Sequence, residues 1–594
     1  MCGIVGYLGN EDAKAIVLNG LFKLEYRGYD SAGLSLYNEK KQRFDMYKDQ
    51  GRVAHLEALS KDAARSSIGI GHTRWATHGK VNQINAHPHV SHSKRFVVVH
   101  NGVIENYKAL KRDFLNGMTL ESETDTEVIV QMLDSFAQNM STKDAVQKTL
   151  GLLKGSYALL ILDQKHPDRL VAAKNKSPLI LGKSDNGFIV ASDLVALSKH
   201  SDCFAPLDDY SVVVVKKDKV SYFNRENSPV EMVFEPMDFD DNLAEMGPYP
   251  HFMLKEIMEQ PLVVRTIINK YFDEDVLKIK PDIIEALNNS DRVYVLAAGT
   301  SMHAGFVGKR LFEKMTDLPV EVHIASEFAY HAPTFSEKPF FVLISQSGET
   351  ADLRACLVHI KELKHRVLTI TNVRTSTLAR EADYFLEIFA GPEIAVASTK
   401  AYTAQLIVLT LLAYAYGKQT FDIRKALSEL AHAMESYLTD FEAVETLAKT
   451  VLTKRNAFFI GRGVDYYVSL EAALKLKEIS YIQAEGFAAG ELKHGTIALI
   501  EENTPVFGLI SDKRIALNTR SNLDEVRSRG ARTVTISIDS LSEEDDAIIL
   551  PDVHEYLRPT MMVLPTQLIA YYAALQRGCD IDKPRNLAKS VTVE

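Results

Sequence analysis

The second half of the chain carries the same spacing of apolar, β-branched runs twice, and this repeat constrains the fold more than any other feature. In both copies the second run begins about 48 residues after the first, and the third about 27 residues later. Apolar runs separated by helix-length segments predict parallel strands with helices on both faces of the sheet. We therefore expect two doubly wound parallel-sheet α/β domains, with ligands at the carboxyl ends of the strands. The runs are 293–297, 340–344 and 367–371, then 457–461, 505–510 and 533–537.

The first 235 residues have a different character. Short β-branched runs bounded by turn-forming residues predict strands at 68–71, 96–99, 157–162 and 211–215, with helices between them. Between residues 235 and 250, acidic residues and three prolines without periodicity predict a linker. The expected domains are residues 2–235, a linker with a leading helix at 236–280, the two α/β domains at 281–425 and 450–583, and a tail at 584–594.

Composition excludes several classes of protein. With 594 residues, 46% of them hydrophobic and 25% charged, the chain has the values of an ordinary globular protein. Its net charge of −10 argues against a nucleic-acid partner, since binding to phosphates requires a basic surface. Four scattered cysteines show no zinc spacing and fit a reducing compartment. The start lacks the features of a signal peptide, and the longest apolar stretch is shorter than the ~18 residues of a membrane span, so we expect a cytoplasmic protein.

A cysteine stands at position two. If Met1 is removed, Cys2 carries both a free α-amine and a thiol, which ordinarily titrate near ~8 and ~8.5. Such a residue supplies a nucleophile and its own general base, as N-terminal nucleophiles do. An incidental cysteine is the alternative and, for this residue taken alone, the commoner one.

Four nearby segments favour the functional interpretation. Residues 71–79 place an arginine, a histidine and the single tryptophan after a strand, and segments 85–89, 99–106 and 122–127 follow. An arginine fork can clamp an α-carboxylate and an aspartate can hold an α-ammonium, while an Asn-Gly pair offers the donors that an oxyanion needs. The alternatives are a hairpin turn at Asn-Gly and a helix N-cap at Ser-Glu-Thr-Asp.

Together these motifs resemble the class II glutamine amidotransferases, most closely the glutamine–fructose-6-phosphate aminotransferase (glucosamine-6-phosphate synthase) family. The matching segments are Cys2 to Gly6, 26–31, 74–79, 100–102 and 123–125. The resemblance implies an N-terminal nucleophile αββα sandwich, in which Cys2 attacks the amide of glutamine and Asn101 and Gly102 form the oxyanion hole. It also implies that glutamine is bound by Arg74, Thr77, His78, His87 and Asp125, and that Trp75 gates an ammonia passage.

A second constellation lies in the repeated half. Residues 345–350, Ser-Gln-Ser-Gly-Glu-Thr, follow an apolar strand directly and lead into helix-like sequence. Hydroxyls, a glycine and a helix N-terminus in one turn predict a phosphate site, to which segments 299–301 and 397–399 could add donors. Capping of the helix by Ser and Thr is the alternative.

Three further features have ordinary explanations when spacing alone is considered. Glu471, Lys475 and Glu478 share one face of a predicted helix, which favours exposed ion pairs. His494, in the segment Gly-Glu-Leu-Lys-His-Gly, is a lone loop histidine of a kind that is usually passive. The last residues, 584–594, are by default a frayed terminus.

Segments 476–482, 490–495 and 586–594 resemble the two sugar isomerase (SIS) domains of the same family, so the resemblance extends from Cys2 to Glu594. It implies that Lys589 forms an imine with a ketose carbonyl, that Glu478 moves a proton between C1 and C2, and that His494 of the partner subunit assists ring opening. The implied sugar-phosphate ligands are Ser301, Ser345, Gln346, Ser347 and Thr350, with Thr300 as a further donor and Val396 and Ala588 against the sugar. Ala298 departs from the family motif, in which several members carry cysteine, and affects no implied role.

The family converts fructose 6-phosphate and glutamine to glucosamine 6-phosphate and glutamate, the first step of hexosamine synthesis. The resemblance implies internal passage of ammonia, no metal or organic cofactor, and a homodimer. Another glutamine-dependent amidotransferase is disfavoured because the second half shows no pyrophosphate- or ATP-binding motif. A non-enzymatic SIS-type sugar-phosphate sensor is disfavoured because no helix-turn-helix candidate is present and a sensor has no use for Cys2.

Overall fold

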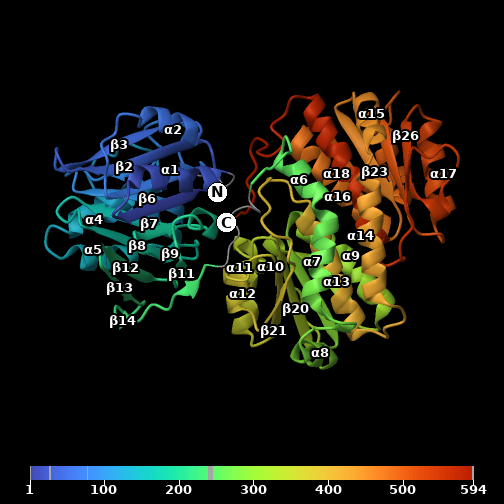
Figure 1. Ribbon diagram of the computed structural model, residues 1–594, viewed down its shortest axis with the longest axis horizontal. Helices are drawn as coiled ribbons and strands as arrows, with labels where there is room; N and C mark the ends of the chain where they lie inside the picture. Colours follow the sequence, from blue (N-terminus) through green and yellow to red (C-terminus); the bar gives the residue numbers. More distant parts are fainter. Residues whose placement is uncertain (1, 26–27, 77, 238–244, 592–594) are drawn as a thin grey trace. The chain divides into compact units, whose positions relative to one another are not determined.

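The structure is a computed structural model that describes residues 2–25, 28–76, 78–237 and 245–591. The described residues form two compact units, one made of 2–237 with 590–591 and the other of 245–589 (Figure 1). Most of the acidic part of the predicted linker, as well as Thr77 and residues 26–27 and 592–594 of the quoted motifs, lies outside the described residues.

The first unit is built on two antiparallel sheets. The eight-stranded sheet has the order β15-β11-β9-β10-β1-β4-β2-β3 and the seven-stranded sheet the order β14-β13-β12-β8-β7-β6-β5. The first sheet comprises β1 (Gly3–Gly9), β2 (Ser31–Asn38), β3 (Arg43–Gln50), β4 (Ile68–Arg74), β9 (Ile180–Ser184), β10 (Gly187–Ala191), β11 (Cys203–Pro206) and β15 (Glu235–Pro236). The second comprises β5 (His89–Val90), β6 (Phe96–Ile104), β7 (Gly155–Asp163), β8 (Arg169–Asn175), β12 (Ser211–Lys216), β13 (Lys219–Phe223) and β14 (Pro229–Val230).

Alternating side chains stack these sheets between two helical layers. In β6, Val97 and Val99 enter the core between the sheets, whereas Phe96 and Val98 face the helices that cover the second sheet. This period of two is what a strand buried on both faces requires. Helices α1 (Ala13–Leu24) and α2 (Val53–Leu59) cover the first sheet, and α3 (Tyr107–Phe114), α4 (Asp125–Phe136) and α5 (Thr142–Leu150) lie on the second (Figure 1). The predicted αββα sandwich is confirmed, and the four predicted strands fall within β4, β6, β7 and β12.

The second unit contains two parallel five-stranded sheets with the same topology, β19-β18-β20-β21-β22 and β24-β23-β25-β26-β27. The predicted duplication and the two doubly wound parallel sheets are therefore confirmed, with each predicted strand inside an observed one. The first sheet comprises β18 (Arg292–Ala297), β19 (Val320–Ile324), β20 (Pro339–Ser345), β21 (Arg366–Thr371) and β22 (Tyr384–Glu387). The second comprises β23 (Asn456–Gly461), β24 (Gln483–Ala488), β25 (Pro505–Ile510), β26 (Arg532–Ile538) and β27 (Ile548–Leu550).

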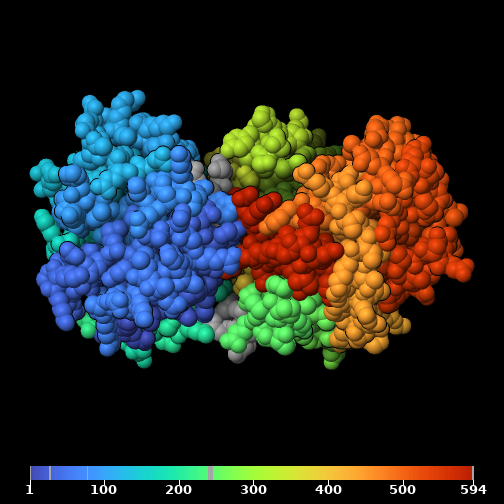
Figure 2. Space-filling model, turned by 90° about the horizontal axis from the view of Figure 1, so that it is seen from above, coloured from blue at the N-terminus to red at the C-terminus, as the bar shows by residue number. Residues whose placement is uncertain are grey.

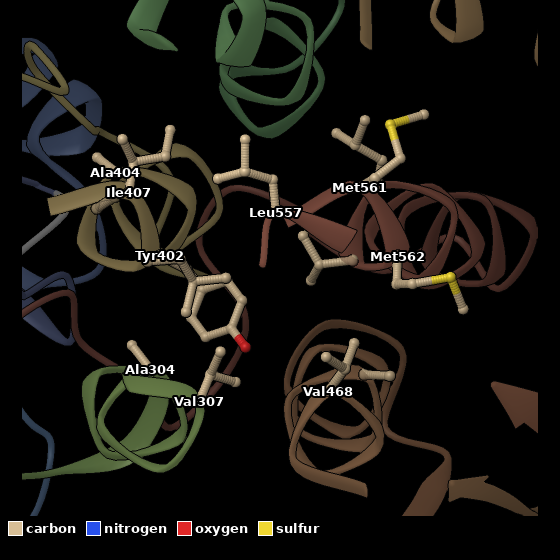
Figure 3. Packing of buried hydrophobic residues seen from close by; sticks show 14 of the residues in the cluster. Ala304, Val307, Tyr402, Ala404, Ile407, Val468, Leu557, Met561 and Met562 are labelled. Carbon is tan, nitrogen blue, oxygen red and sulfur yellow. The ribbon is translucent and has the colours of Figure 1, made fainter. Parts of the chain in front are cut away.

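One apolar core continues through both repeats of the second unit. It joins strand residues of both sheets to four helices that lie between them, α9 (Gly299–Met315), α13 (Lys400–Tyr416), α16 (Val464–Ser480) and α18 (Arg558–Gln576) (Figure 1). Figure 3 shows the meeting point, where the ring of Tyr402 on α13 points toward Val307 of α9 and Val468 of α16 lies below Met562 of α18. Nearly every side chain of α13 and α18 is buried, as expected for helices packed on all sides. No described helix combines the length and the hydropathy needed to cross a membrane.

The remaining helices cover the outer faces and join the repeats. They are α6 (Phe252–Met258), α7 (Gln260–Tyr271), α8 (Pro281–Asn288), α10 (Ala325–Tyr330), α11 (Ala351–Glu362), α12 (Thr377–Glu381), α14 (Ile423–Tyr437), α15 (Glu442–Val451) and α17 (Ala516–Arg527), with a small ribbon of β16 (Phe272–Asp273) and β17 (Val276–Leu277). The described part of the segment 236–280 thus holds α6, α7 and this ribbon. On the face shown in Figure 2, the red C-terminal residues lie beside the green α6 region, where Asp582 binds the N-terminus of α6.

Candidate functional site

The thiol of Cys2 lies at the start of β1, beside the residue that follows β4. Pairing of Gly3 with Thr73 brings these two strand ends together, and the backbone N–H of Trp75 donates to Cys2 Sγ at 3.2 Å. Burial raises the pKa of the Cys2 thiol, whereas the Trp75 hydrogen bond and the Arg74 charge act to lower it. A base close to the thiol is therefore needed to make it a nucleophile.

Asn101 and Gly102, the predicted oxyanion hole, lie inside β6 next to Cys2. Asn101 Nδ2 donates to the carbonyl oxygen of Cys2 at 3.0 Å. Gly102 has φ of +134°, and a Cβ at this position would lie 2.1 Å from the carbonyl oxygen of Ser156, so only glycine fits here. The hairpin alternative for this pair is wrong, because β6 continues through both residues.

A pocket beside the thiol gathers most of the residues predicted for glutamine. Arg74, His78, His87 and Asp125 line it together with Cys2; Trp75 and Gly102 are also part of its wall. Thr77, the other residue predicted for glutamine, lies outside the described residues.

Arg74 and Asp125 are both buried in this pocket and carry opposite charges, the arrangement that an amino acid's carboxylate and ammonium require. One carboxylate oxygen of Asp125 accepts the N–H of Ile104 at 2.8 Å. Asp125 is the first residue of α4, and the hydroxyl of Thr124 accepts the N–H of Glu127. The N-cap interpretation of this segment is therefore also correct: capping places Asp125 at the pocket.

Sequence reasoning missed three residues of the pocket wall, His100, Thr124 and Thr126. His100 Nδ1 is 2.9 Å from the hydroxyl of Thr126, which links β6 to α4. Both threonines flank Asp125 in the quoted motif, and His100 directly precedes Asn101. Proximity in sequence to the predicted residues was thus an available signal.

Four buried histidines lie in or next to this pocket: His87 and His100 line it, and His72 and His89 pack against His87. The ring centroids of His72 and His87 are 4.1 Å apart, and those of His87 and His89 are 4.9 Å apart. Burial lowers the pKa of all four, for His72 to about 3. The folded unit therefore keeps these imidazoles neutral at pH values where the unfolded chain protonates them.

We expect the first unit to lose stability as the pH falls from about 6.5 toward about 3. In this window the unfolded chain binds more protons, so each histidine lowers the free energy of unfolding by up to about 1.4 kcal/mol per pH unit. Thermal melts of the protein between pH 7 and pH 4.5 measure this slope. His72→Gln should make the slope shallower, whereas His92→Gln, which changes an exposed histidine of the same unit, should not. Equal slopes for His72→Gln and the unchanged protein would contradict the assignment.

The predicted phosphate segment forms a tight turn between β20 and α11. Ser345 Oγ accepts the N–H of Gly348 at 3.0 Å and lies 3.0 Å from the hydroxyl of Thr350, and Ser347 Oγ accepts the N–H of Glu349 at 3.2 Å. Gly348 has φ of +66°, and a Cβ there would meet Ser376 Oγ at 2.0 Å. Thr350 stands at the N-cap of α11 but makes no side-chain capping hydrogen bond. The hydroxyl of Thr350 contacts Ser345 in the turn and does not accept a hydrogen bond from the first turn of the helix.

Thr300 and Ser301 stand at the start of α9, after the neighbouring strand β18. Because β18 and β20 pair in parallel, their carboxyl ends bring α9 and the 345–350 turn to the same edge of the sheet. Gln405 of α13 donates its Nε2 to Ser301 Oγ at 3.0 Å, and both residues are buried. Gln405 has no motif around it, and sequence reasoning did not find it.

Glu471, Lys475 and Glu478 do share one face of α16, but the exposed ion-pair interpretation is wrong. Glu471 and Lys475 are buried, with side chains 0% and 1% exposed, because this face packs on α9. Lys475 Nζ is 2.6 Å from Glu478 and donates to Thr300 Oγ1 at 3.0 Å. Burial acts to lower the pKa of Lys475, but the two glutamates outweigh it and raise that pKa. Glu471 also accepts from His303 of α9 at 2.7 Å.

The tail is ordered through Val591, so the frayed-terminus interpretation is wrong for its described part. Lys589 Nζ forms an ion pair with Glu393, and both side chains are buried. Upstream, the N–H of Arg585 donates to the hydroxyl of Tyr481 at 2.8 Å, and its guanidinium lies 4.1 Å from the centre of that ring. The backbone N–H of Val396 donates to the Asp582 carbonyl at 2.9 Å, which fixes the predicted sugar-contacting segment against the tail.

Glu393 is a functional candidate that sequence reasoning missed. It accepts the N–H groups of Thr399 and Ala401 at 2.9 and 3.0 Å and the hydroxyl of Ser398 at 2.8 Å, in addition to Lys589. The Gly-Pro-Glu-Ile segment around it carries no recognisable motif, and Lys589, its charged partner, is 196 positions away in the sequence. Only folding could bring this carboxylate to the lysine.

His494 stands apart from these groups within the chain. It is exposed at the end of the 3₁₀ helix Ala489–His494, and no described contact links it to Glu478 or Lys589. Ala588 is half-buried directly before Lys589. In the part of the chain that the structure describes, no three His, Cys, Asp or Glu side chains are grouped so that they could hold a metal ion.

Sequence profiles of known domains match both units. The SIS domain matches residues 286–415 and 451–577, and the glutamine amidotransferase domain matches residues 59–235. The C-terminal domain of glucosamine-fructose-6-phosphate aminotransferase from Francisella tularensis superimposes with a TM-score of 0.54 at 33% identity, covering 57% of this chain and 99% of that one.

Relatives are similar over the whole length. The glutamine–fructose-6-phosphate aminotransferases (isomerizing) of Shouchella clausii, Halalkalibacterium halodurans and Listeria monocytogenes are 56%, 55% and 53% identical to this chain, with 100% of each sequence covered. At this identity and coverage the similarity spans both units, and the chain belongs to the glutamine–fructose-6-phosphate aminotransferase (isomerizing) family.

Proposed function

We propose that this enzyme converts fructose 6-phosphate and glutamine to glucosamine 6-phosphate and glutamate. Glutamine and water give glutamate and ammonia, and ammonia replaces the ketose oxygen, which leaves as water. The observation that carries the proposal is the full-length similarity to enzymes of this name. The two constellations described above supply chemistry for each half of the reaction.

In the first unit, Cys2 acts as the nucleophile toward the side-chain amide of glutamine. Removal of Met1 supplies a neutral α-amine on the same residue, which takes the thiol proton and returns it to the leaving ammonia. Asn101 Nδ2 and the backbone of Gly102 stabilise the oxyanion of the tetrahedral intermediate. Arg74 binds the α-carboxylate of glutamine and Asp125 its α-ammonium. Thr77, His78 and His87 complete the glutamine site.

In the second unit, Lys589 attacks the open-chain ketose carbonyl and forms an imine with loss of water. Ammonia then displaces the Lys589 amine from C2, which frees the lysine and leaves a C=N bond to the incoming nitrogen. Glu478 removes a proton from C1 and returns it at C2, so that the sugar becomes an aldose with the amino group on C2. The phosphate is bound by Thr300, Ser301, Ser345, Gln346, Ser347 and Thr350, and Val396 and Ala588 contact the sugar. This division of labour rests on the buried Lys589–Glu393 pair and on the hydroxyl-rich turn after β20.

The enzyme is a cytoplasmic homodimer, and His494 of the partner subunit assists ring opening. Its domains are 2–235, 281–425 and 450–583, joined by the 236–280 segment and completed by the 584–594 tail. Ammonia passes internally from Cys2 to the sugar, with Trp75 as the gate, and no metal, nucleotide or pyridoxal cofactor takes part.

We expect the nitrogen of the product to come from glutamine even when free ammonium is present. The test supplies glutamine labelled with ¹⁵N in the amide, fructose 6-phosphate and an excess of unlabelled ammonium, and measures glucosamine 6-phosphate by mass spectrometry. Product that is almost entirely ¹⁵N supports both the reaction and internal transfer. Product with the isotope ratio of the solution would contradict internal transfer, and absence of an amino sugar would contradict the proposed reaction.

A further inference from the structure

Within the second unit, a series of contacts links the segment that carries Lys589 to α6, α6 to the 393–396 loop, and that loop back to Lys589. The carboxylate of Asp582 accepts the N–H groups of Phe252 and Met253, both at 2.9 Å, at the N-terminus of α6. One turn further along α6 stands Glu256, which is 1% exposed. Helix α6 is thus fixed to the tail at one end and presents a buried carboxyl group at the next turn.

Glu256 fixes the loop that carries the partner of Lys589. Its Oε1 accepts the N–H groups of Ile394 and Ala395 at 2.5 and 3.1 Å, directly after Glu393. Its Oε2 is buried and has no hydrogen-bond partner among the described residues. The circuit therefore runs from the tail to α6, from α6 to this loop, and from Glu393 back to Lys589.

Glu256 and Glu393 differ in their hydrogen-bond partners, and therefore in how readily each carboxyl group ionises. Glu393 accepts from three neutral donors and from Lys589, whereas Glu256 accepts from two backbone N–H groups and leaves one oxygen unsatisfied. Two adjacent buried carboxyl groups are not both readily ionised. Burial, and then the charge of Glu393, raise the pKa of Glu256 to about 8, while Lys589 holds the pKa of Glu393 low despite its burial.

We propose that Glu256 is a positioning residue for Lys589, and that it acts in its neutral form by fixing the 393–396 loop while leaving Glu393, among the described residues, as the carboxylate paired with the lysine. The inference rests on the proposed function, in which Lys589 must lose its proton before it attacks the ketose. Ionised Glu256 would place a second negative charge near the ammonium of Lys589 and favour its protonated form.

Other charged groups also face Glu256. Lys589 approaches from the tail, Glu393 from the loop, and Lys400 from α13. Lys400 Nζ is 2.7 Å from Glu259, whose carboxylate also lies 3.1 Å from Lys255. Glu259 therefore neutralises much of the charge of Lys255 and Lys400. The charges of Glu393 and Lys589 remain the ones that most directly affect the ionisation of Glu256.

The test compares Glu256→Gln and Glu256→Ala with the unchanged full-length enzyme, using Glu435→Gln as a matched control at an exposed carboxylate of α14. Formation of glucosamine 6-phosphate is measured from pH 6.5 to 9.5 at saturating glutamine. At pH 7, the kcat of Glu256→Gln should be within about threefold of that of the unchanged enzyme. Above about pH 8, ionisation of Glu256 should lower the kcat of the unchanged enzyme, and Glu256→Gln should not show this decrease. Glu256→Ala should lower kcat by about tenfold or more at every pH, with a smaller change in KM for fructose 6-phosphate.

Three results would overturn the inference: a normal kcat for Glu256→Ala, a kcat for Glu256→Gln as low as that of Glu256→Ala at every pH, or an alkaline fall in Glu256→Gln equal to that of the unchanged enzyme. If Glu256→Ala does not fold, the pH dependence of kcat for Glu256→Gln on the alkaline side is sufficient to test the inference. Failure of the unchanged enzyme to make any amino sugar would instead contradict the proposed function.

Discussion

Replacing Cys2 by alanine is expected to abolish hydrolysis of glutamine, with a loss of kcat on the order of 10⁴-fold or more. The Sγ atom lies in the pocket that also holds Arg74 and Asp125, and alanine leaves no nucleophile there. Isomerisation of fructose 6-phosphate should persist, because its residues lie in the second unit. Release of glutamate from glutamine and conversion of the sugar phosphate are the two measurements.

Cys203→Ala is the matched control, since Cys203 is a half-buried thiol of β11 in the same unit but away from the pocket. It should retain both activities. Loss of isomerisation in a folded Cys2→Ala variant would argue against two separable sites. Full use of glutamine by a mature protein that keeps Met1 would exclude the α-amine of Cys2 as the base.

Replacing Lys589 by arginine is expected to stop formation of glucosamine 6-phosphate while some glutamine hydrolysis continues. Arginine keeps the cation that Glu393 requires but cannot form the imine. Lys589→Ala should have the same effect on the product, and in addition leaves the buried Glu393 carboxylate without its counter-charge, which costs about 3–5 kcal/mol of stability. The arginine variant therefore separates the chemical role of Lys589 from its structural one.

Borohydride reduction in the presence of fructose 6-phosphate provides the direct test of the lysine. Mass spectrometry should find the reduced sugar adduct on Lys589 in the unchanged enzyme, and no adduct in Lys589→Arg. Lys513→Arg, at an exposed lysine of the second repeat, should be labelled at Lys589 as usual. Trapping at another lysine in the unchanged enzyme would show that the imine forms elsewhere.

Strands and layers could be predicted from the sequence because local chemistry determines them. The apolar runs of the second half form β18, β20, β21, β23, β25 and β26, and their repeated spacing gives two sheets of the same strand order. Motif residues of the first half also come together as expected, with Arg74, His87 and Asp125 around Cys2.

Residue spacing failed where burial decides the outcome. Glu471 and Lys475 have the spacing of an exposed ion pair, and spacing contains no information on whether that helix face meets water or α9. The tail likewise looked like a frayed end, because its contacts with α6 and the 393–396 loop join residues about 190 to 330 positions apart. Such contacts depend on how the repeats pack.

The sequence by itself predicted the strands and the parallel sheets of the second half and the hydroxyl-rich turn after β20, because residue type and local periodicity are readable along the chain. Cys2 was a candidate from its position, and Lys589 was a candidate only through the resemblance of its segment to a known family. Only the tertiary structure decided which buried carboxyl groups surround Lys589. Glu256 and Glu393 lie in segments without motifs, and their charge state depends on desolvation and on neighbours that come together only when the chain folds.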